Sequence, residues 1–491
     1  MIKFASSFLG FMNEDFNENE FSIFDLLDRF EQMLKDNTSM YFESEDFEEI
    51  INFYLDTGNL KLAKRAIEEA IHQYPSDYIF SLKQAQYLAA NNHEQAALEI
   101  LSHIEKLEPH DAEIYFTRGT IFSKREKHLE AINEFNRALE YSEDPIDIYL
   151  TIAYEYQKLT DYDSAIKVLL KALKMEPNDE DLINELAFCY EITDRLEEGA
   201  ETLQRFVDEH PYSAQGWFNL GLIFNKLGLY EKSVEAFDFA LAIDPSNTSA
   251  YFNKANAFAN AEMYEQAIVV YKEVLEMDEP DALTYSYIGE CYMKLDNTDK
   301  AIEYYTQALK LDDQLAEAWH GLAISYETIG KHKTALININ KALKIDPYNP
   351  SFYHLRGLIY LSLQEFSKSF ADLKKAVDRI DIPKELWVEL SRVAIVGDLQ
   401  DEVAAFLLSL EGTEKWEDFI HLAMANIYLS AGRQKEGLMR LQKGVKALEG
   451  NAKSLFDFFP EMKFFNEVIE FIALYPNNNN PLLPDGGNPS K

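Results

Sequence analysis

Small side chains return every 34 residues along this chain of 491 residues, and this period constrains the fold more than any other feature. Followed in steps of 34, the column of Gly221 and the column of Ser233 each hold a small residue at eleven of twelve places. No residue is inserted or lost across the twelve units, so one packing geometry is repeated. The Gly221 column reads Ile51, Ala85, Gly119, Ala153, Ala187, Gly221, Ala255, Gly289, Ala323, Gly357, Ser391 and Ala425.

Each unit is predicted to form two helices. Apolar residues recur at the i, i+3, i+4, i+7 spacing of one helix face, first in Trp217, Leu220, Gly221 and Phe224, then in Ser233, Phe237 and Ala240. Gly228 is predicted to break the chain between the helices, and Asp244-Pro245 to stop the second one. Helix axes approach to about 8 Å only where the side chains at the crossing are small. We therefore expect the helices to touch at the two small columns.

The unit from Trp217 to Pro245 resembles the tetratricopeptide repeat. It matches the pattern W-x2-L-G-x2-Y, A-x3-F, P, with Phe224 in place of Tyr and Ser233 in place of Ala. The resemblance covers residues 44–451 and implies an all-α, right-handed α-solenoid superhelix of about twelve helix-turn-helix repeats with capping helices.

One unit departs from the repeat pattern. The unit from Lys384 has Val403 and Leu410 where small residues are usual, and it lacks the closing proline. We expect looser stacking or a bend at this unit.

Segments outside the repeats complete a four-part organisation. Residues 1–43 are predicted to be an acidic segment with a capping helix, 452–475 a Phe-rich capping helix, and 476–491 a disordered tail. The apolar arc of the Phe-rich helix spans roughly 180°, more than covering one neighbour requires. Two interpretations stay open, a cap sunk against the last repeat or a homodimer contact. Residues 1–11 resemble a weak signal peptide but lack an A-x-A-like cleavage site.

Composition disfavours several classes of function. There are 85 acidic residues against 46 Lys plus Arg, a formal net charge of -39, and this field disfavours nucleic acid and anionic lipid. No run of 18 apolar residues indicates a transmembrane helix. Common catalytic, phosphate-binding and metal-binding motifs are missing, so we expect no enzyme activity, no cofactor and no metal site.

Cysteine and histidine usage adds little chemistry. Cys189 and Cys291 stand three repeats apart, too far to form a disulfide within one chain, which suits a cytoplasmic location. His320 and His354 share a slot in neighbouring repeats, with Glu290 and Glu317 near in sequence. Two histidines without a third ligand at fixed spacing indicate ordinary polar residues rather than a metal site.

The side of each first helix opposite its packing side is the candidate binding surface, and we call it the groove face. In this family it lines the concave groove where partners bind. In the unit from Trp217 it consists of Gln215, Phe218, Asn219, Leu222, Asn225 and Lys226.

An aromatic and amide-rich patch occupies equivalent slots along the middle of the array. Amides can pair with the backbone of an extended peptide, and aromatic rings can bury its side chains. Asn219 and Asn253 would form two rungs of an asparagine ladder. The predicted partner-binding residues are Phe116, Tyr154, Asn184, Phe188, Phe218, Asn219, Asn225, Phe252, Asn253, Asn256 and Asn260.

The sequence therefore predicts a non-catalytic scaffold or adaptor that binds a protein or peptide in its groove. The main alternative is a homo-oligomeric assembly protein that uses its Phe-rich C-terminal end. An enzyme with a site hidden in the groove is the third hypothesis, and the missing motifs disfavour it.

Overall fold

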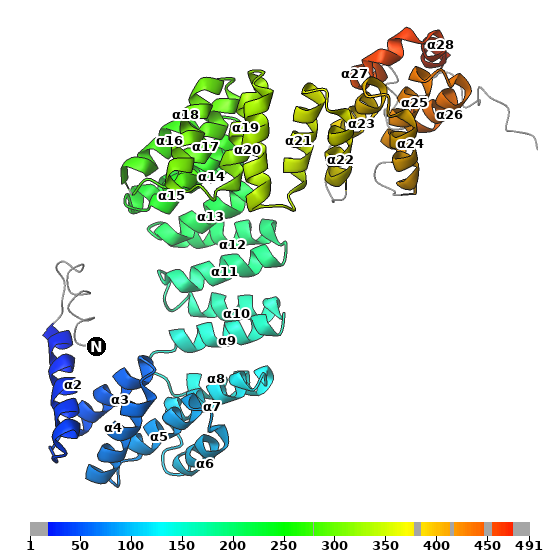
Figure 1. The fold of residues 1–491 in the computed structure, drawn as a ribbon. Coiled ribbons are helices and arrows are strands. Elements are labelled where there is room, and N and C mark those ends of the chain that lie inside the picture. Colours follow the sequence, from blue (N-terminus) through cyan, green and yellow to red (C-terminus); the bar gives the residue numbers. More distant parts are fainter. Residues whose placement is uncertain (1–17, 278, 378–383, 413–416, 446–453, 475–491) are drawn as a thin grey trace, which may run out of the picture. The chain divides into compact units, whose positions relative to one another are not determined.

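The structure is a computed structural model that describes residues 18–277, 279–377, 384–412, 417–445 and 454–474. The chain divides into two compact units, residues 1–243 and 244–491. Throughout the described residues the regular structure is helical and contains no strand (Figure 1). Residues 1–11 and the tail 476–491, for which a signal peptide and disorder were considered, lie outside the described residues.

The described residues of the first unit, 18–243, form thirteen helices. They are α2 (Glu18–Asp36), α3 (Ser44–Asp56), α4 (Leu60–Gln73), α5 (Tyr78–Ala90), α6 (Glu94–Ile104), α7 (Ala112–Lys124), α8 (His128–Leu139), α9 (Ile146–Lys158), α10 (Tyr162–Ala172), α11 (Glu180–Ile192), α12 (Leu196–Glu209), α13 (Ala214–Lys226) and α14 (Tyr230–Ile243). Each packs against the helices before and after it in this unit.

The second unit continues the alternation. Its helices are α15 (Thr248–Asn260), α16 (Tyr264–Met277), α17 (Ala282–Lys294), α18 (Thr298–Leu311), α19 (Ala316–Thr328), α20 (His332–Ile345), α21 (Pro350–Ser362), α22 (Phe366–Val377), α23 (Glu385–Val396), α24 (Gln400–Ser409), α25 (Glu417–Ser430), α26 (Gln434–Gly444), α27 (Leu455–Phe458), η3 (Pro460–Phe464) and α28 (Asn466–Leu474). From α15 to α26 each helix packs on its chain neighbours, and first helices of adjacent repeats such as α17 and α19 also touch. The described chain is an all-α solenoid of helix pairs, as the period predicts.

The two helices of a repeat meet at the small columns. In α13, a Cβ on Gly221 would lie 2.7 Å from Phe237 Cε1 of α14, closer than carbon atoms can approach. Ser233, fully buried on α14, donates a hydrogen bond from its hydroxyl to the carbonyl of Gly221 at 2.8 Å. The predicted contact at these two columns is confirmed, and it joins a side chain of one helix directly to the backbone of the other.

At this crossing the size of the residue on the first helix is matched to the size of its partner on the second. Gly119, Gly221 and Gly289 each face an aromatic ring 16 residues further along, in Phe135, Phe237 and Tyr305. Alanine in the same slot instead precedes leucine or isoleucine in five units, in the pairs Ala85 and Leu101, Ala153 and Leu169, Ala187 and Leu203, Ala323 and Ile339, Ala425 and Leu441. Gly357 with Leu373 and Ala255 with Tyr271 depart from this rule. In the other units the larger ring is paired with the smaller residue, as close packing of the interior favours.

Every turn between the two helices contains one residue with positive φ. The twelve residues stand in one column at 34-residue steps: Gly58, Asn92, Glu126, Thr160, Asp194, Gly228, Glu262, Asp296, Gly330, Gln364, Asp398 and Gly432. The predicted break at Gly228 is confirmed. Only four of the twelve are glycine, so eight repeats hold an L side chain in a conformation that disfavours it.

Two kinds of polar contact hold the start of many first helices. The side chain of Asp111 accepts from the backbone N–H of Glu113 at 2.9 Å, the usual N-cap arrangement. The indole of Trp217 donates to the carbonyl of Pro211 at 3.0 Å, and Tyr115, Trp319 and Tyr353 make the same bond six residues back. The equivalent N-caps are Asp77, Asp179, Ser213, Asn247, Asp281 and Asn349.

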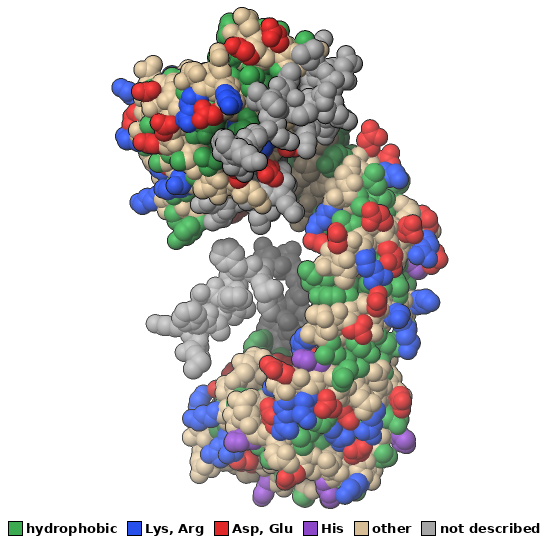
Figure 2. Space-filling model, turned by 90° about the vertical axis from the view of Figure 1, so that its right-hand side faces the viewer, with side chains coloured by type: hydrophobic (Ala, Val, Ile, Leu, Met, Phe, Trp, Pro, Cys, Tyr) green, Lys and Arg blue, Asp and Glu red, His purple; other side chains and the backbone are tan. Residues whose placement is uncertain are grey.

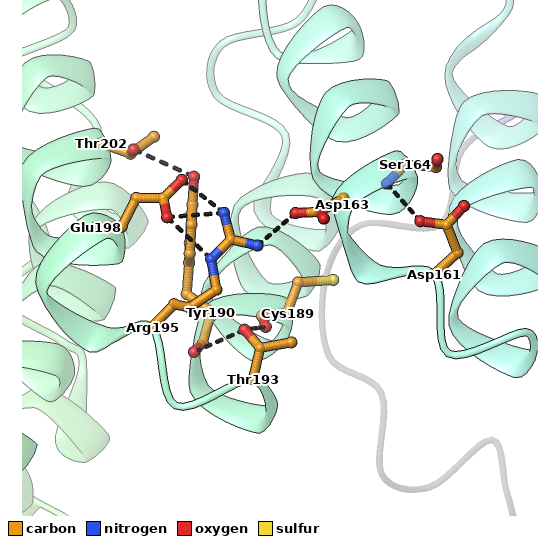
Figure 3. Close-up of polar contacts among 9 residues, drawn as sticks. All are labelled: Asp161, Asp163, Ser164, Cys189, Tyr190, Thr193, Arg195, Glu198 and Thr202. Atoms are coloured by element: carbon orange, nitrogen blue, oxygen red, sulfur yellow. Dashed lines mark hydrogen bonds and ion pairs between the residues drawn. The ribbon is translucent and has the colours of Figure 1, made fainter.

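An arginine at the turn ties neighbouring repeats together. Arg195 lies between Glu198 on α12 and Asp163 on α10, and donates to them at 2.7 and 2.6 Å (Figure 3). Seven repeats further on, Arg433 binds Glu436 and Asp401 in the same pattern. Exposed pairs of this kind contribute little to stability, so their main effect is to fix how neighbouring repeats align.

The prediction of one Phe-rich helix over 452–475 is wrong. Pro460 has no backbone N–H and restricts Phe459 to an extended conformation, so the segment breaks into α27, η3 and α28. Phe459, Met462 and Val468 are buried in the core that also contains residues of α25. The exposed apolar side chains are Phe464 and Ile469, at 86% and 47% exposure. The packing supports a cap on the last repeat, as α2 packs on α3 at the other end.

The unusual unit from Lys384 accommodates its larger residues. Val403 is fully buried together with Ala394 and Leu407 in one continuous apolar core. Residues 378–383 before this unit and 413–416 after it are outside the described residues, so looser stacking there stays a prediction.

We expect Gly221→Ala to destabilise the chain by about 1–3 kcal/mol, because the added methyl overlaps the Phe237 ring. Phe237→Leu in the same chain should recover part of this loss, since alanine with leucine is the pairing of other repeats. Urea unfolding of both single variants and the double variant, followed by circular dichroism, measures the coupling. Strictly additive effects would contradict the proposed matching of side-chain size between positions 221 and 237.

Thr160→Gly should stabilise the chain by about 1 kcal/mol, because Thr160 has φ 58 and a β-branched side chain is strained there. The matched control is Thr306→Gly on the exposed side of α18, where glycine in a helix costs about 1 kcal/mol. Thermal unfolding should shift in opposite directions in the two variants. A loss of stability in both would show that the turn is not strained.

Candidate functional site

The predicted patch is divided between the two units, and its aromatic residues in the first unit differ in exposure. The rings of Phe116 and Phe218 are half-buried and pack 5.4 Å from Phe135 and 5.8 Å from Phe237. Tyr154 on α9 and Phe188 on α11 are exposed at 41% and 46%. Phe116 and Phe218 therefore belong partly to the core, while Tyr154 and Phe188 are open to a ligand.

The amides of the first unit bind one another. Asn219 is buried and donates to Asn184 Oδ1 at 2.9 Å and to the carbonyl of Gln215 at 3.2 Å. The Gln215 side chain donates to the same Asn184 oxygen at 2.6 Å. Asn225 is half-buried at the end of α13. The amide N–H groups of Asn219 thus join α11 to α13, and Asn184 is the exposed member of the cluster.

The second unit brings Phe252 and Asn256 to one aromatic cluster. The Phe252 ring lies 5.8 Å from Tyr271 and 5.7 Å from Tyr287, and the Tyr271 hydroxyl donates to Asn256 Oδ1. Asn253 donates to the carbonyl of Ser249 in its own helix, and Asn260 is exposed at the end of α15. These bonds place Phe252 and Asn256 beside Tyr287, which the sequence analysis did not single out.

A hollow of about 480 Å³ opens on the groove face of α17 and α19. Six of its lining residues lie on α17, at the groove-face slots of the unit from Trp217 shifted by 68 residues, which is two repeats. Applying the same slots to this unit would have found them. The lining consists of Leu283, Ser286, Tyr287, Glu290, Met293, Lys294, Tyr305, Leu315, Glu317, His320, Gly321 and Ile324.

Tyr305 reaches the hollow from α18, the helix behind α17. A Cβ on Gly321 would lie 2.3 Å from Tyr305 Cζ, so the hydroxyl end of the ring occupies the space that a side chain at 321 would need. The ring is 5% exposed, and burial raises the pKa of its phenol above the usual value. Within the described part of the chain the hydroxyl makes no hydrogen bond, so it is available to a ligand.

His320 lines the hollow as a neutral group. Burial, with a smaller effect of His354, lowers the pKa of its imidazole to about 4. The ring lies 4.9 Å from the ring of Phe352, and no hydrogen bond joins it to any residue that the structure describes. A neutral imidazole has one N–H donor and one nitrogen acceptor, so a ligand in the hollow can bind to the ring in either way.

Two carboxylates and one ammonium group complete the lining. Glu290 on α17 and Glu317 on α19 are exposed and both raise the pKa of the Tyr287 phenol, after the larger effect of its burial. Neither carboxylate forms an ion pair with a described residue, and the same holds for Lys294. The hollow thus combines apolar walls with a small set of polar groups, the usual composition of a binding site.

The described residues lack metal-binding clusters and membrane-spanning helices. They contain no group of three or more His, Cys, Asp or Glu that could hold a metal ion, and no helix both long and apolar enough to cross a membrane. His354 Nε2 lies 2.5 Å from Glu389 Oε2, and Cys189 and Cys291 are buried and unpaired. Figure 2 shows acidic and basic side chains interspersed on the face it draws.

Profiles described as tetratricopeptide repeat match more than half of the chain. The matched residues are 52–106, 112–145, 146–179, 214–247, 248–281, 281–347 and 350–380. With the helix pairs and the 34-residue period, these matches show that the chain belongs to the tetratricopeptide repeat family. A search of curated proteins found no match.

Solved structures of tetratricopeptide repeat proteins are similar to parts of the chain. YrrB, described as a protein with an unusual peptide-binding site, is 22% identical over 36% of this chain and 92% of its own, with a TM-score of 0.30. MamA is 21% identical over 35% of this chain and 98% of its own, with a TM-score of 0.31. The Cut9-Hcn1 hetero-tetramer of APC/C gives 14% identity over 89% of this chain and 95% of the matched chain, with a TM-score of 0.34. At these identities and scores no function is carried over.

Lowering the pH from 7 to 5 should destabilise the wild-type chain by about 2 kcal/mol relative to His320→Gln. The folded-state pKa of His320 is about 4, below the unfolded value, so in this interval the unfolded chain binds a proton that the folded chain does not. Urea unfolding of both proteins across the interval measures the difference. Parallel pH profiles would contradict a neutral, buried His320.

Proposed function

We propose that this chain is a non-catalytic protein-interaction scaffold that holds an extended segment of a partner protein on the groove face of α17 and α19. The observation that carries the proposal is the hollow of about 480 Å³, which lies on the slots where this family presents its concave surface. Membership of the tetratricopeptide repeat family supports it.

The physical basis is that polar groups able to form hydrogen bonds lie beside apolar walls in the hollow. Tyr305 and His320 each offer hydrogen-bonding capacity that no described residue uses. Both groups line the hollow, so polar groups of a ligand in it can hydrogen-bond to them. An extended segment presents backbone N–H and C=O groups along its length, together with side chains that fill a hollow.

The aromatic cluster of Phe252, Tyr271 and Tyr287 extends the same surface onto α15. We include Phe252, Asn253, Asn256 and Asn260 in the proposed contact surface of the second unit. In the first unit the proposed contact surface consists of Tyr154, Asn184 and Phe188. Asn219 positions Asn184 through its hydrogen bond and is not itself a proposed contact. Phe116, Phe218 and Asn225 remain proposed contacts whose half-buried side chains leave less surface.

Homo-oligomeric assembly through the C-terminal end remains the second candidate. It is supported by Phe464 and Ile469, which stay exposed after the rest of the segment packs on the last repeat. Truncation after residue 450, followed by light scattering, separates the two. Loss of a dimer without aggregation supports assembly, and aggregation supports a cap.

Ser286→Trp should weaken binding of a partner segment at least about tenfold, because the indole fills the hollow that the segment needs. The matched control is Thr306→Trp, which makes a similar change on the exposed side of α18 outside the hollow. Peptides selected from a random displayed library against the wild-type chain serve as probes, with affinity measured by fluorescence polarisation. Equal affinity of the two variants would remove the groove-face assignment.

A further inference from the structure

We propose that the hollow on α17 and α19 is a specificity pocket for an arginine side chain of the bound segment. The inference rests on the proposed function, since it names the residue class that the segment must carry. Three observations support it. The hollow has two carboxylates without an ion-pair partner among the described residues, apolar walls beside an aromatic ring, and further groups that can form hydrogen bonds.

The carboxylates make the charge of the pocket negative. Glu290 and Glu317 come from adjacent first helices, α17 and α19, and both line the hollow together with Tyr287. No described basic residue pairs with either, although Lys294 lines the same hollow. Two carboxylates against one ammonium leave a net negative pocket in a chain of net charge -39. A cationic partner is favoured electrostatically, and an acidic one is disfavoured.

The walls suit the stem of a long side chain. Leu283, Met293 and Ile324 provide apolar surface, and the ring of Tyr287 is half-buried among them. The methylene stem of arginine packs on apolar surface while its charged end stays near polar groups. Its planar guanidinium also stacks on aromatic faces, which the compact ammonium of lysine does less well.

The lining offers several hydrogen-bond acceptors, as a guanidinium with its many N–H donors requires. Arginine carries five N–H donors and no acceptor. The carboxylates accept in a charge-assisted, bidentate geometry, and the neutral imidazole of His320 and the hydroxyl of Tyr305 offer further acceptor positions. A leucine or methionine side chain would fill the same space but make no hydrogen bond and no charge interaction with these groups, so it would gain less affinity.

The test uses pools of blocked peptides of about nine residues, random except for one fixed central residue, so that each pool spans roughly 30 Å when extended. Binding of each pool to the full chain is measured by fluorescence polarisation. The arginine pool should bind about tenfold more tightly than the leucine pool, with lysine between them and glutamate weakest.

The decisive variant is Glu290→Gln with Glu317→Gln, which should remove most of the arginine preference. Its control is Glu273→Gln with Glu303→Gln, which changes the net charge equally at exposed positions of α16 and α18 outside the hollow and should keep the preference. Circular dichroism confirms that both variants are folded.

The outcomes separate this inference from the function on which it rests. If no pool binds the wild-type chain, the proposed peptide binding itself is wrong. If pools bind without an arginine preference, or if the preference survives Glu290→Gln with Glu317→Gln, the groove can still bind segments but the pocket assignment is overturned. Equal loss of preference in the control variant would show that the preference depends only on the net charge of the chain. That result would also overturn the pocket assignment.

Discussion

The close approach of the two helices within each repeat is the contact on which the rest of the structure depends. At this crossing a side chain of the second helix lies directly on the backbone of the first, as Phe237 does on Gly221. The Ser233 hydroxyl adds a hydrogen bond to the Gly221 carbonyl. Since the crossing recurs at every 34 residues, it fixes which side of each first helix is packed and which side remains for other contacts.

The free side varies because the crossing does not constrain it. Asn219, Tyr287 and Gly321 occupy one and the same slot in three repeats. Asn219 bridges two first helices, Tyr287 forms a wall of the hollow, and Gly321 leaves the space into which Tyr305 extends. A solenoid can therefore change its binding surface at one slot while the stacking contacts stay the same.

Periodic features could be predicted from the sequence, and features that depend on two unrelated columns could not. The helix pairs, the break at Gly228 and the stop before Pro245 follow from local spacing, and the structure confirms them. The patch of aromatic and amide residues was chosen by residue type, which says nothing of whether an amide such as Asn219 is already bound by a neighbour. The hollow depends on the length of Tyr305 together with the missing side chain at Gly321, and no single repeat contains both.

Tyr305 shows how the core and the candidate site share one side chain. Its ring packs against Gly289 at the crossing of its own repeat, where a Cβ would lie 3.0 Å away, and its hydroxyl end reaches Gly321 of the next. A Cβ at 289 would require the ring to shift slightly, and a Cβ at 321 would overlap it. The two glycines thus serve different purposes, one for the contact within the repeat and one for the opening between repeats. A ligand that binds the Tyr305 hydroxyl would touch the packing core itself, so we expect occupancy of the hollow to stabilise α17, α18 and α19 as a group.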